Sequence, residues 1–288
     1  MRILAVAGLL MVSGVAASAQ TPVTFASHDY GAAAAPRAIV SADFNRDGWL
    51  DLATAGTERD SIAILLNNGA NGGFRTLPDR VVGGGPFDIA AGDLNRDGIP
   101  DLVIANADAD AVDALLGAGD GTFPASTRIN MPGAGPRGVA LTDFDGNGRL
   151  DIIVTEFATG AWRVLYGDGL GGIARQDRFG SIRSPQGVVA ADFNHDGRPD
   201  VAIAGAGINL VAVFYTQPNG GIVQKNVVVG TAVNVLAAGD FNHDGWLDLS
   251  AGPRPTARSI RCTAARPASL TEWRRRPAPR RGVSSRST

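Results

Sequence analysis

The sequence has 288 residues, of which 44% are apolar, 38 are glycine and 16 are proline. This length supports one large domain or two ordinary ones, and the glycine and proline content disfavours a helical protein and favours short strands joined by tight turns. The formal net charge of −2 conceals an acidic body, because ten of the 26 basic residues follow Gly252, and the single cysteine, Cys262, excludes an internal disulfide.

Residues 1–19 have the pattern of a secretory signal peptide. Arg2 precedes an apolar run from Ile3 to Val15, and Ala17-Ser18-Ala19 offers a small-residue cleavage site. The run is shorter than the ~20 residues that a membrane helix needs, and no other stretch approaches that length. We therefore expect a mature protein that is secreted, periplasmic or at the cell surface. A buried N-terminal helix or strand is the alternative.

Five nearly identical nine-residue segments recur along the chain. They begin at Asp43, Asp93, Asp143, Asp192 and Asp240 and have the sequences DFNRDGWLD, DLNRDGIPD, DFDGNGRLD, DFNHDGRPD and DFNHDGWLD. Their spacings of 50, 50, 49 and 48 residues indicate one structural repeat rather than five separate motifs.

Each segment lies among the same predicted strands. An apolar run precedes it, such as GVVAA, and another follows it, such as VAIAG. Because these two runs lack polar alternation, we expect strands that are buried on both faces. A third apolar run, a glycine-rich turn such as GAGDGTF and a more polar fourth run complete the unit. The sequence therefore predicts four antiparallel strands per repeat.

These units predict an all-β fold, a β-propeller of four-stranded blades within residues 20–251. A unit with two apolar faces must stack on its neighbours, and stacking around an axis buries both faces. Four repeats are complete and a fifth is partial, so a truncated longer propeller or a linear solenoid is the alternative. The stretch TFASHDYGAAAAPR aligns with a fourth strand, Phe25 matching Phe74 and Phe123, which predicts ring closure by an N-terminal strand.

The nine-residue segment has the donor pattern of a calcium loop. Positions 1, 3 and 5 carry side-chain oxygens, glycine at position 6 permits a sharp turn, position 7 offers its carbonyl, and position 9 adds a carboxylate. Hard oxygen ligands suit Ca²⁺, whereas zinc prefers His and Cys. Each loop keeps three carboxylates, even in the third copy, where positions 3 and 5 exchange acid and amide.

The loop pattern has two other interpretations. Turns formed by Asp, Asn and Gly alone are the first alternative, although they do not account for three mutually repelling acids in every copy. An EF-hand or dockerin is excluded, because both need an acidic ligand at position 12. That position holds Thr54, Ile104, Val154, Ile203 and Ala251.

The repeats resemble FG-GAP or VCBS-type repeats, which form β-propellers with calcium loops in integrin α-subunits and in many exported bacterial proteins. The resemblance covers residues 23–251 and implies that the side chains at positions 1, 3, 5 and 9 and the carbonyl at position 7 bind calcium. The implied ligands are Asp43, Asn45, Asp47, Trp49 and Asp51; Asp93, Asn95, Asp97, Ile99 and Asp101; Asp143, Asp145, Asn147, Arg149 and Asp151; Asp192, Asn194, Asp196, Arg198 and Asp200; and Asp240, Asn242, Asp244, Trp246 and Asp248.

Residues 252–288 break the repeat pattern. They are rich in arginine, proline and serine and lack periodicity, so we expect a basic tail that is disordered. The abrupt change within a predicted strand favours a reading-frame error or a truncation. A polybasic arm for anionic polymers or membranes is the alternative.

The sequence predicts a binding protein rather than an enzyme. His195 and His243 occupy loop position 4, where we expect them to point to solvent, and His28 has no evident partner. No Gly-x-Ser-x-Gly or His-Glu-x-x-His motif is present, and the glycine-rich turns lack the lysine and helix of a phosphate loop. We expect a non-catalytic, calcium-stabilised scaffold for binding or adhesion to an extracellular protein or glycan, with no nucleic-acid partner. The alternative is the propeller part of an exported polysaccharide-acting enzyme.

Overall fold

The computed structural model describes residues 30–180, 182–206, 208–229 and 233–252, together with the backbone of residues 263–265. The predicted signal peptide lies outside these residues, as do His28, Cys262 and most of the basic tail. Among the described residues, no helix is long and apolar enough to cross a membrane. The one helical element in that part of the chain is a single 3₁₀ turn, η1 (Gly69–Asn71).

Five antiparallel sheets follow one another along the chain, one for each repeat. The first contains β1 (Pro36–Ala42), β2 (Asp51–Gly56), β3 (Ser61–Asn67), β4 (Phe74–Thr76) and β5 (Arg80–Val81). The second contains β6 (Pro86–Gly92), β7 (Asp101–Asn106), β8 (Ala111–Leu116) and β9 (Ala125–Asn130). The third contains β10 (Pro136–Thr142), β11 (Asp151–Glu156), β12 (Ala161–Gly167) and β13 (Ile173–Gly180). The fourth contains β14 (Pro185–Ala191), β15 (Asp200–Gly205), β16 (Leu210–Thr216) and β17 (Ile222–Val228), and the fifth contains β18 (Val235–Gly239), β19 (Asp248–Gly252) and β20 (Thr263–Ala265).

The strand order confirms the predicted four-stranded unit. In the second, third and fourth sheets, consecutive strands pair in chain order as an up-and-down meander. The first sheet differs only in its outer edge, where β4 and β5 divide the fourth strand and both pair with β3. The repeat of about 49 residues is therefore one sheet, as its turn signals predict.

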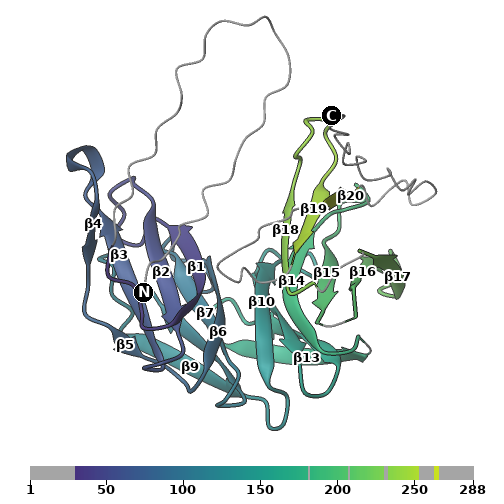
Figure 1. Cartoon of the computed structure of the whole chain (residues 1–288), viewed down its shortest axis with the longest axis horizontal. Coiled ribbons are helices and arrows are strands. Elements are labelled where there is room, and N and C mark those ends of the chain that lie inside the picture. The colour runs from purple at the N-terminus through teal and green to yellow at the C-terminus, as the bar shows by residue number, and fades with distance from the viewer. Residues whose placement is uncertain (1–29, 181, 207, 230–232, 253–262, 266–288) are drawn as a thin grey trace, which may run out of the picture.

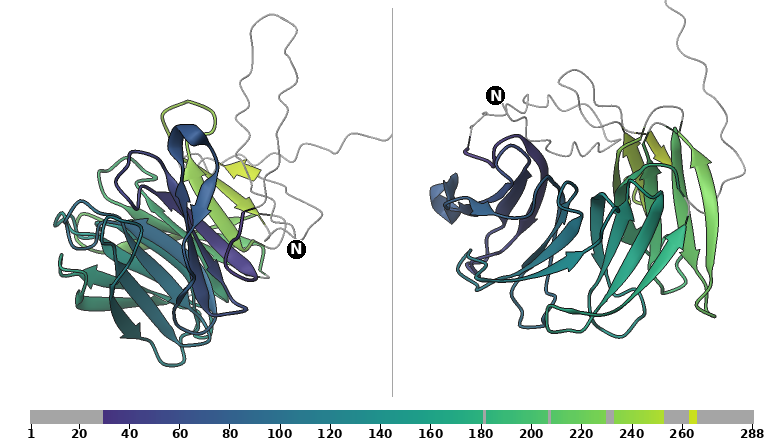
Figure 2. Two further views of the ribbon diagram at one scale, coloured as in Figure 1. Left: turned by 90° about the vertical axis from the view of Figure 1, so that its left-hand side faces the viewer. Right: turned by 90° about the horizontal axis from the view of Figure 1, so that it is seen from below.

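The sheets fan around a common axis, which is the arrangement of blades in a β-propeller (Figures 1 and 2). Each sheet presents its first strand to the axis, and the contacts between neighbouring sheets run mainly through β1, β6, β10, β14 and β18. Figure 1 shows an open arc, with the first and fifth sheets apart. The ring is not closed within the described residues. The stretch predicted to supply the closing strand, including Phe25, lies largely outside them, so closure by an N-terminal strand stays a prediction.

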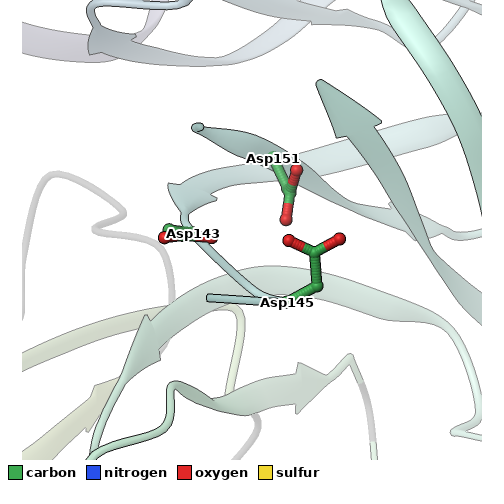
Figure 3. Close-up of side chains that lie close together, drawn as sticks. All are labelled: Asp143, Asp145 and Asp151. Carbon is green, nitrogen blue, oxygen red and sulfur yellow. The ribbon is translucent and has the colours of Figure 1, made fainter. Parts of the chain in front are cut away.

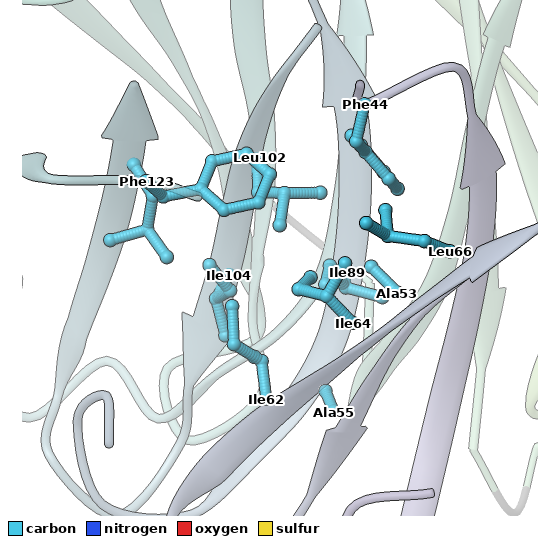
Figure 4. Close-up of a cluster of buried hydrophobic side chains, with 11 residues drawn as sticks. Phe44, Ala53, Ala55, Ile62, Ile64, Leu66, Ile89, Leu102, Ile104 and Phe123 are labelled. Atoms are coloured by element: carbon cyan, nitrogen blue, oxygen red, sulfur yellow. The ribbon is translucent and has the colours of Figure 1, made fainter. Parts of the chain in front are cut away.

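The core consists of apolar side chains packed between adjacent sheets. Figure 4 shows the layer between the first two repeats, where Ile62 and Ile64 meet Leu102 and Ile104. Every residue of β7, β11 and β15 is buried, as the unbroken apolar runs predict. Burial of this apolar surface is the main stabilising term of the fold, at about 25 cal/mol per Å².

The expectation of burial on both faces is wrong for the first strands of the first and fifth sheets, whereas β6, β10 and β14 consist of buried and half-buried residues. β1 alternates between half-buried and exposed residues, and β18 is largely exposed. The physical reason is position, since β1 and β18 belong to the first and fifth sheets, and each of these sheets has a neighbouring sheet on one side only within the described residues.

The basic tail is not wholly without structure. Residues Thr263–Ala265 form β20, which pairs antiparallel with β19 between Leu249 and Ala251. The prediction of a disordered tail is therefore wrong for these three residues. Backbone hydrogen bonds to an open strand edge need no apolar pattern in the added segment, so this pairing has no signal in the residue pattern.

Candidate functional site

The five acidic loops connect the first and second strands of the five sheets. Asp43 follows β1 and Asp51 begins β2, and the other four loops occupy the same place in their sheets. Each loop folds back through two residues in the left-handed region, at positions 4 and 6. Position 6 is always glycine, with φ between +79° at Gly98 and +87° at Gly48. Glycine adopts this conformation without the steric cost that a Cβ brings.

Position 4 also requires a positive φ, which the sequence analysis missed. Arg46, Arg96, His195 and His243 have φ from 58° to 64°, and the third loop has Gly146 in the same place. His195 and His243 are exposed there, as the sequence predicts, but the conformational requirement of the position was not recognised. The signal in the sequence was the glycine of the third loop, which marks the conformation that the other four copies adopt under strain.

The carboxylate at position 1 organises the turn. In the first loop, Asp43 Oδ1 accepts a hydrogen bond from the backbone N–H of Asp47 at 3.1 Å, and Oδ2 accepts one from Gly48 at 2.8 Å. Asp93, Asp143, Asp192 and Asp240 accept the same pair of bonds. These bonds between the position-1 side chain and the backbone hold the loop in shape without a ligand.

Positions 3, 5 and 7 are linked in the same way. In the first loop the amide of Asn45 donates to Asp47 Oδ2 at 2.9 Å, and Asp47 Oδ1 accepts from the backbone N–H of Trp49. The position-7 residues of the other loops, Ile99, Arg149, Arg198 and Trp246, donate to position 5 in the same way. The structure therefore brings positions 1, 3, 5 and 7 together in one turn, while calcium binding by the position-7 carbonyl stays a prediction.

The acid at position 9 is buried at the base of each loop. Asp51, Asp101, Asp151 and Asp200 are 0% exposed, and Asp248 is 2% exposed. Asp51 Oδ2 accepts from the N–H of Phe44 and Oδ1 from that of Asn67, so it ties the loop to the end of β3. Asp101, Asp151 and Asp200 make the equivalent two bonds, to Leu94 and Gly117, Phe144 and Gly167, and Phe193 and Thr216. This structural role was not visible in the sequence.

Burial makes these position-9 carboxyls harder to ionise. Desolvation raises the pKa of Asp51, Asp101 and Asp151, and the charges of the acids at positions 1 and 3 or 5 raise it further, against the two backbone hydrogen bonds. The pKa of Asp200 rises to about 6 for the same reasons. Each loop therefore concentrates negative charge around a carboxylate that water cannot solvate.

The third loop gathers its carboxylates most closely. Asp143, Asp145 and Asp151 each place an oxygen within 4.8 Å of the others, and this is the one such group of acids, His or Cys among the described residues. Figure 3 shows Asp145 and Asp151 pointing toward one another. The difference from the other loops follows from the exchange of acid and amide, because an acid at position 3 replaces the Asn that elsewhere donates to position 5.

The guanidinium group of Arg175 lies beside this cluster. Arg175 Nη2 is 3.2 Å from Asp145 Oδ2 and its Nη1 is 2.8 Å from Asp177 Oδ2, while its guanidinium lies 3.3 Å from the centroid of the Tyr166 ring. Arg175 is half exposed and borders a groove of about 850 Å³ between the third and fourth loops. It reduces the repulsion of the third loop without entering it.

The donor set fits calcium rather than a softer ion. All side-chain donors are carboxylate or amide oxygens, and carboxylates that bind a backbone N–H retain further lone pairs. In the first, second and fourth loops the position-3 amide turns its NH₂ toward the position-5 carboxylate. Its oxygen accepts a hydrogen bond from the backbone N–H of position 5 and retains a further lone pair for an ion. The residues of the third loop fit a cation as they stand.

A stack of blade-like sheets with one acidic loop in each defines a repeat protein of the β-propeller type. The FG-GAP-like repeat model matches residues 43–104, 93–154 and 143–203. These segments together span more than half of the chain, so the chain belongs to the family of FG-GAP-like repeat proteins, as the loop motif and the turn GAGDGTF indicate. Family and fold together favour a binding scaffold.

Similarity to solved structures supports the fold alone. A protein from Lactobacillus plantarum shares 17% identity over 80% of this chain and 70% of its own, with a TM-score of 0.54. A crystal structure of BBS1N in complex with ARL6DN, soaked with lead, shares 13% identity over 77% of this chain and 63% of its own, with a TM-score of 0.49. Among curated protein sequences, none matches this chain.

Proposed function

We propose that the chain is an exported, calcium-stabilised propeller that acts as a non-catalytic scaffold for binding or adhesion, with an extracellular protein or glycan as its partner. The observation that carries the calcium role is the convergence of Asp143, Asp145 and Asp151 within 4.8 Å. Three carboxylates at this separation repel one another, and a divalent ion converts that repulsion into attraction. Export is supported by the signal-peptide pattern of residues 1–19.

The proposed role of calcium is structural. The loops join the first two strands of each sheet, and the position-9 acids join the loop to the third strand. An ion in the loop would therefore hold the first three strands of a blade together at the end where the loop lies. A site with a dissociation constant typical of extracellular modules, about 0.1 to 1 mM, adds about 1.4 kcal/mol at ten times that concentration. Several such sites would add a large fraction of the stability of a domain.

A non-catalytic role is supported by the surroundings of the buried acids. Carboxyls with a raised pKa are candidates for general acids, and here Asp51, Asp101, Asp151 and Asp200 have this property. Each of them is held by two backbone N–H groups at the base of a loop, away from a place where a substrate bond could approach. The shift therefore fits an ion site better than acid catalysis.

Thermal unfolding tests the calcium role. The purified chain is melted in 5-fold steps of CaCl₂ and in EDTA, with MgCl₂ at the same ionic strength as the control. We expect the midpoint to rise with calcium and to fall in EDTA, and magnesium to reproduce little of the effect because it demands strict octahedral geometry. A midpoint that is the same in EDTA and in millimolar calcium would overturn the calcium role.

A further inference from the structure

A second pocket lies at the end of the sheets opposite the acidic loops, near the axis. It has a volume of about 600 Å³, and its lining includes one residue from each repeat. These five residues are Arg37, Phe87, Arg137, Gln186 and Asn234. Each stands six residues before the first aspartate of its loop, so they are equivalent positions of the repeat. The loops are nearly identical among repeats, whereas this position differs in chemistry from one repeat to the next.

A β-bulge accounts for the direction of these side chains. The pairing of β1 with β2 shifts register between Pro36 and Ala38, which leaves Arg37 as the extra residue. The same shift occurs around Phe87, Arg137 and Gln186 in the next three sheets. A bulge turns one side chain away from the regular alternation of a strand and is frequent beside functional sites. Four consecutive sheets therefore use one device to direct this position into the pocket.

Two guanidinium groups share the pocket. Arg37 of β1 and Arg137 of β10 both lie over the ring of Phe87, at 4.8 and 4.9 Å from its centroid, and Arg137 also lies 3.3 Å from the centroid of Phe157. Within the described part of the chain, neither forms an ion pair with a carboxylate within 4.0 Å. Burial lowers the pKa of Arg137 and the charge of Arg37 lowers it further, with Asp108 opposing. The two positively charged guanidinium groups thus both contact the ring of Phe87.

Gln186 adds a polar group that lacks a partner. Its side chain is 8% exposed and lines the pocket, and its Oε1 has no hydrogen-bond partner among the described residues. Its main-chain oxygen accepts a bond from Thr155 Oγ1 at 2.8 Å, which fixes the strand beneath it. A buried polar atom without a partner costs about 1–3 kcal/mol, and a ligand that supplies the missing hydrogen bond removes that cost.

We propose that this axial pocket binds an acidic sugar residue, with its carboxylate on Arg37 and Arg137 and its hydroxyl groups on Gln186 and Asp108. A guanidinium pair recognises a carboxylate by charge-assisted hydrogen bonds. Gln186 needs a hydrogen-bond donor, and the carboxylate of Asp108, which lines the same pocket, accepts only. One ligand that satisfies all four groups is a carboxylate that carries several hydroxyls. The inference rests on the binding function proposed above and names its ligand class.

Ligand-observed NMR on the purified chain in calcium tests the assignment. Saturation transfer and titration are recorded with D-galacturonate as the probe, D-galactose as its uncharged counterpart, and N-acetyl-aspartate amide as a peptide carboxylate. We expect galacturonate to bind and galactose to bind at least about tenfold more weakly, because the charge-assisted bonds are lost. Tighter binding of the aspartate compound than of galacturonate would overturn the sugar in favour of a peptide.

Substitutions of the pocket residues test whether the ligand binds there. Arg37→Gln and Arg137→Gln should each weaken galacturonate about tenfold or more, and Gln186→Leu should weaken it less. Arg59→Gln is the matched control, since Arg59 is exposed in the β2–β3 turn at the same end of the molecule. If Arg137→Gln does not fold, Arg37→Gln carries the test, because Arg37 is exposed. Unchanged affinity in the folded variants, or no binding of galacturonate at all, would overturn the inference.

The same samples separate this inference from the proposed function. Their melting midpoints are recorded in calcium and in EDTA. A midpoint that depends on calcium, in a chain that binds none of the three probes, rejects the acidic-sugar pocket and leaves the calcium role intact. If the chain binds galacturonate but its melting midpoint does not depend on calcium, only the calcium role is rejected.

Discussion

The ring of His195 stacks on the ring of Trp246, with centroids 4.1 Å apart and an interplanar angle of 27°. His195 is position 4 of the fourth loop and Trp246 is position 7 of the fifth. Trp246 thus packs against the neighbouring loop. The fourth and fifth loops are therefore in contact with one another as well as with their own sheets.

This stack should couple the fourth and fifth sheets. We expect His195→Ala and Trp246→Ala to lower the free energy of unfolding, and a double-mutant cycle between them to give a coupling of about 0.5–1.5 kcal/mol. The measurement is chemical denaturation followed by far-UV circular dichroism. His243→Ala is the control, because His243 has the same loop position and the same backbone conformation without a described loop beyond it. A coupling energy near zero would show that the stack is incidental.

Glu156 should make the free energy of unfolding depend on pH. Burial alone would raise its pKa, but hydrogen bonds from Arg178, Thr159 and Arg163 together bring the pKa below the ordinary value of 4.5. The ionised form thus stabilises the fold above pH 4.5, and this contribution is lost as the pH falls through the lower, folded-state pKa. Glu156→Gln should cost about 3 kcal/mol at pH 7 and progressively less as the pH falls below 4.5, as measured by urea unfolding over that range.

The control for this ion pair is an exposed one. Asp177 pairs with Arg175 at 2.8 Å, and both side chains are about half exposed, at 49% and 51%. Asp177→Asn should therefore change the free energy of unfolding by no more than about 1 kcal/mol at pH 7. Equal losses for Glu156→Gln and Asp177→Asn would contradict the buried role of Glu156.

The third loop allows a charge-neutral test of its donor set. Asp145→Asn removes one of the three clustered carboxylates, and we expect it to remove most of the calcium stabilisation of that loop, about 1.4 kcal/mol at ten times the dissociation constant. Asp145→Asn combined with Asn147→Asp restores three acids in the order of the other loops. Calcium-dependent melting of both variants should show a loss in the first and recovery in the second. Identical melting of the two variants would exclude a role for the number of carboxylates.

The glycine at loop position 6 should be required for its backbone conformation and not for lack of space. A Cβ added at Gly98 would meet nothing within 4 Å, but φ is +79°. Gly98→Ala should therefore cost about 1–2 kcal/mol through strain alone. Gly180→Ala is the matched control, since its Cβ also meets nothing and its φ is not in the left-handed region. Thermal unfolding should show a lower midpoint for the first variant and an unchanged or slightly higher one for the second.

Sequence reasoning reached the fold because the repeat carries its own signals. Unbroken runs such as DLVIAN have no polar face and so predict buried strands, and glycines at loop position 6 predict sharp turns. The loop residues themselves were found for the same reason, since their chemistry repeats. The structural role of Asp51 was missed, because its bond from the backbone N–H of Asn67 depends on the third strand, whose last residue lies 16 positions further on.

The axial pocket could not be found from the repeat pattern. Arg37, Phe87, Arg137 and Gln186 share a position but not one residue type, so alignment of the repeats gives no consensus that would mark them as a site. Their common direction depends on a register shift between strands, which is a property of pairing and not of any one residue. The strand β20 was missed for a similar reason, because its partner is an open edge rather than a pattern in its own sequence.

Loop position 2 shows what a neighbouring sheet means for a side chain. Phe44 and Phe193 fill the space between adjacent sheets and are 1% and 0% exposed, whereas the equivalent Phe241 of the fifth loop is 52% exposed. Among the described residues no further sheet packs on this side of the fifth sheet, which accounts for the exposure of Phe241. A hydrophilic residue at that position would therefore remove exposed apolar surface and leave the layers between the described sheets intact.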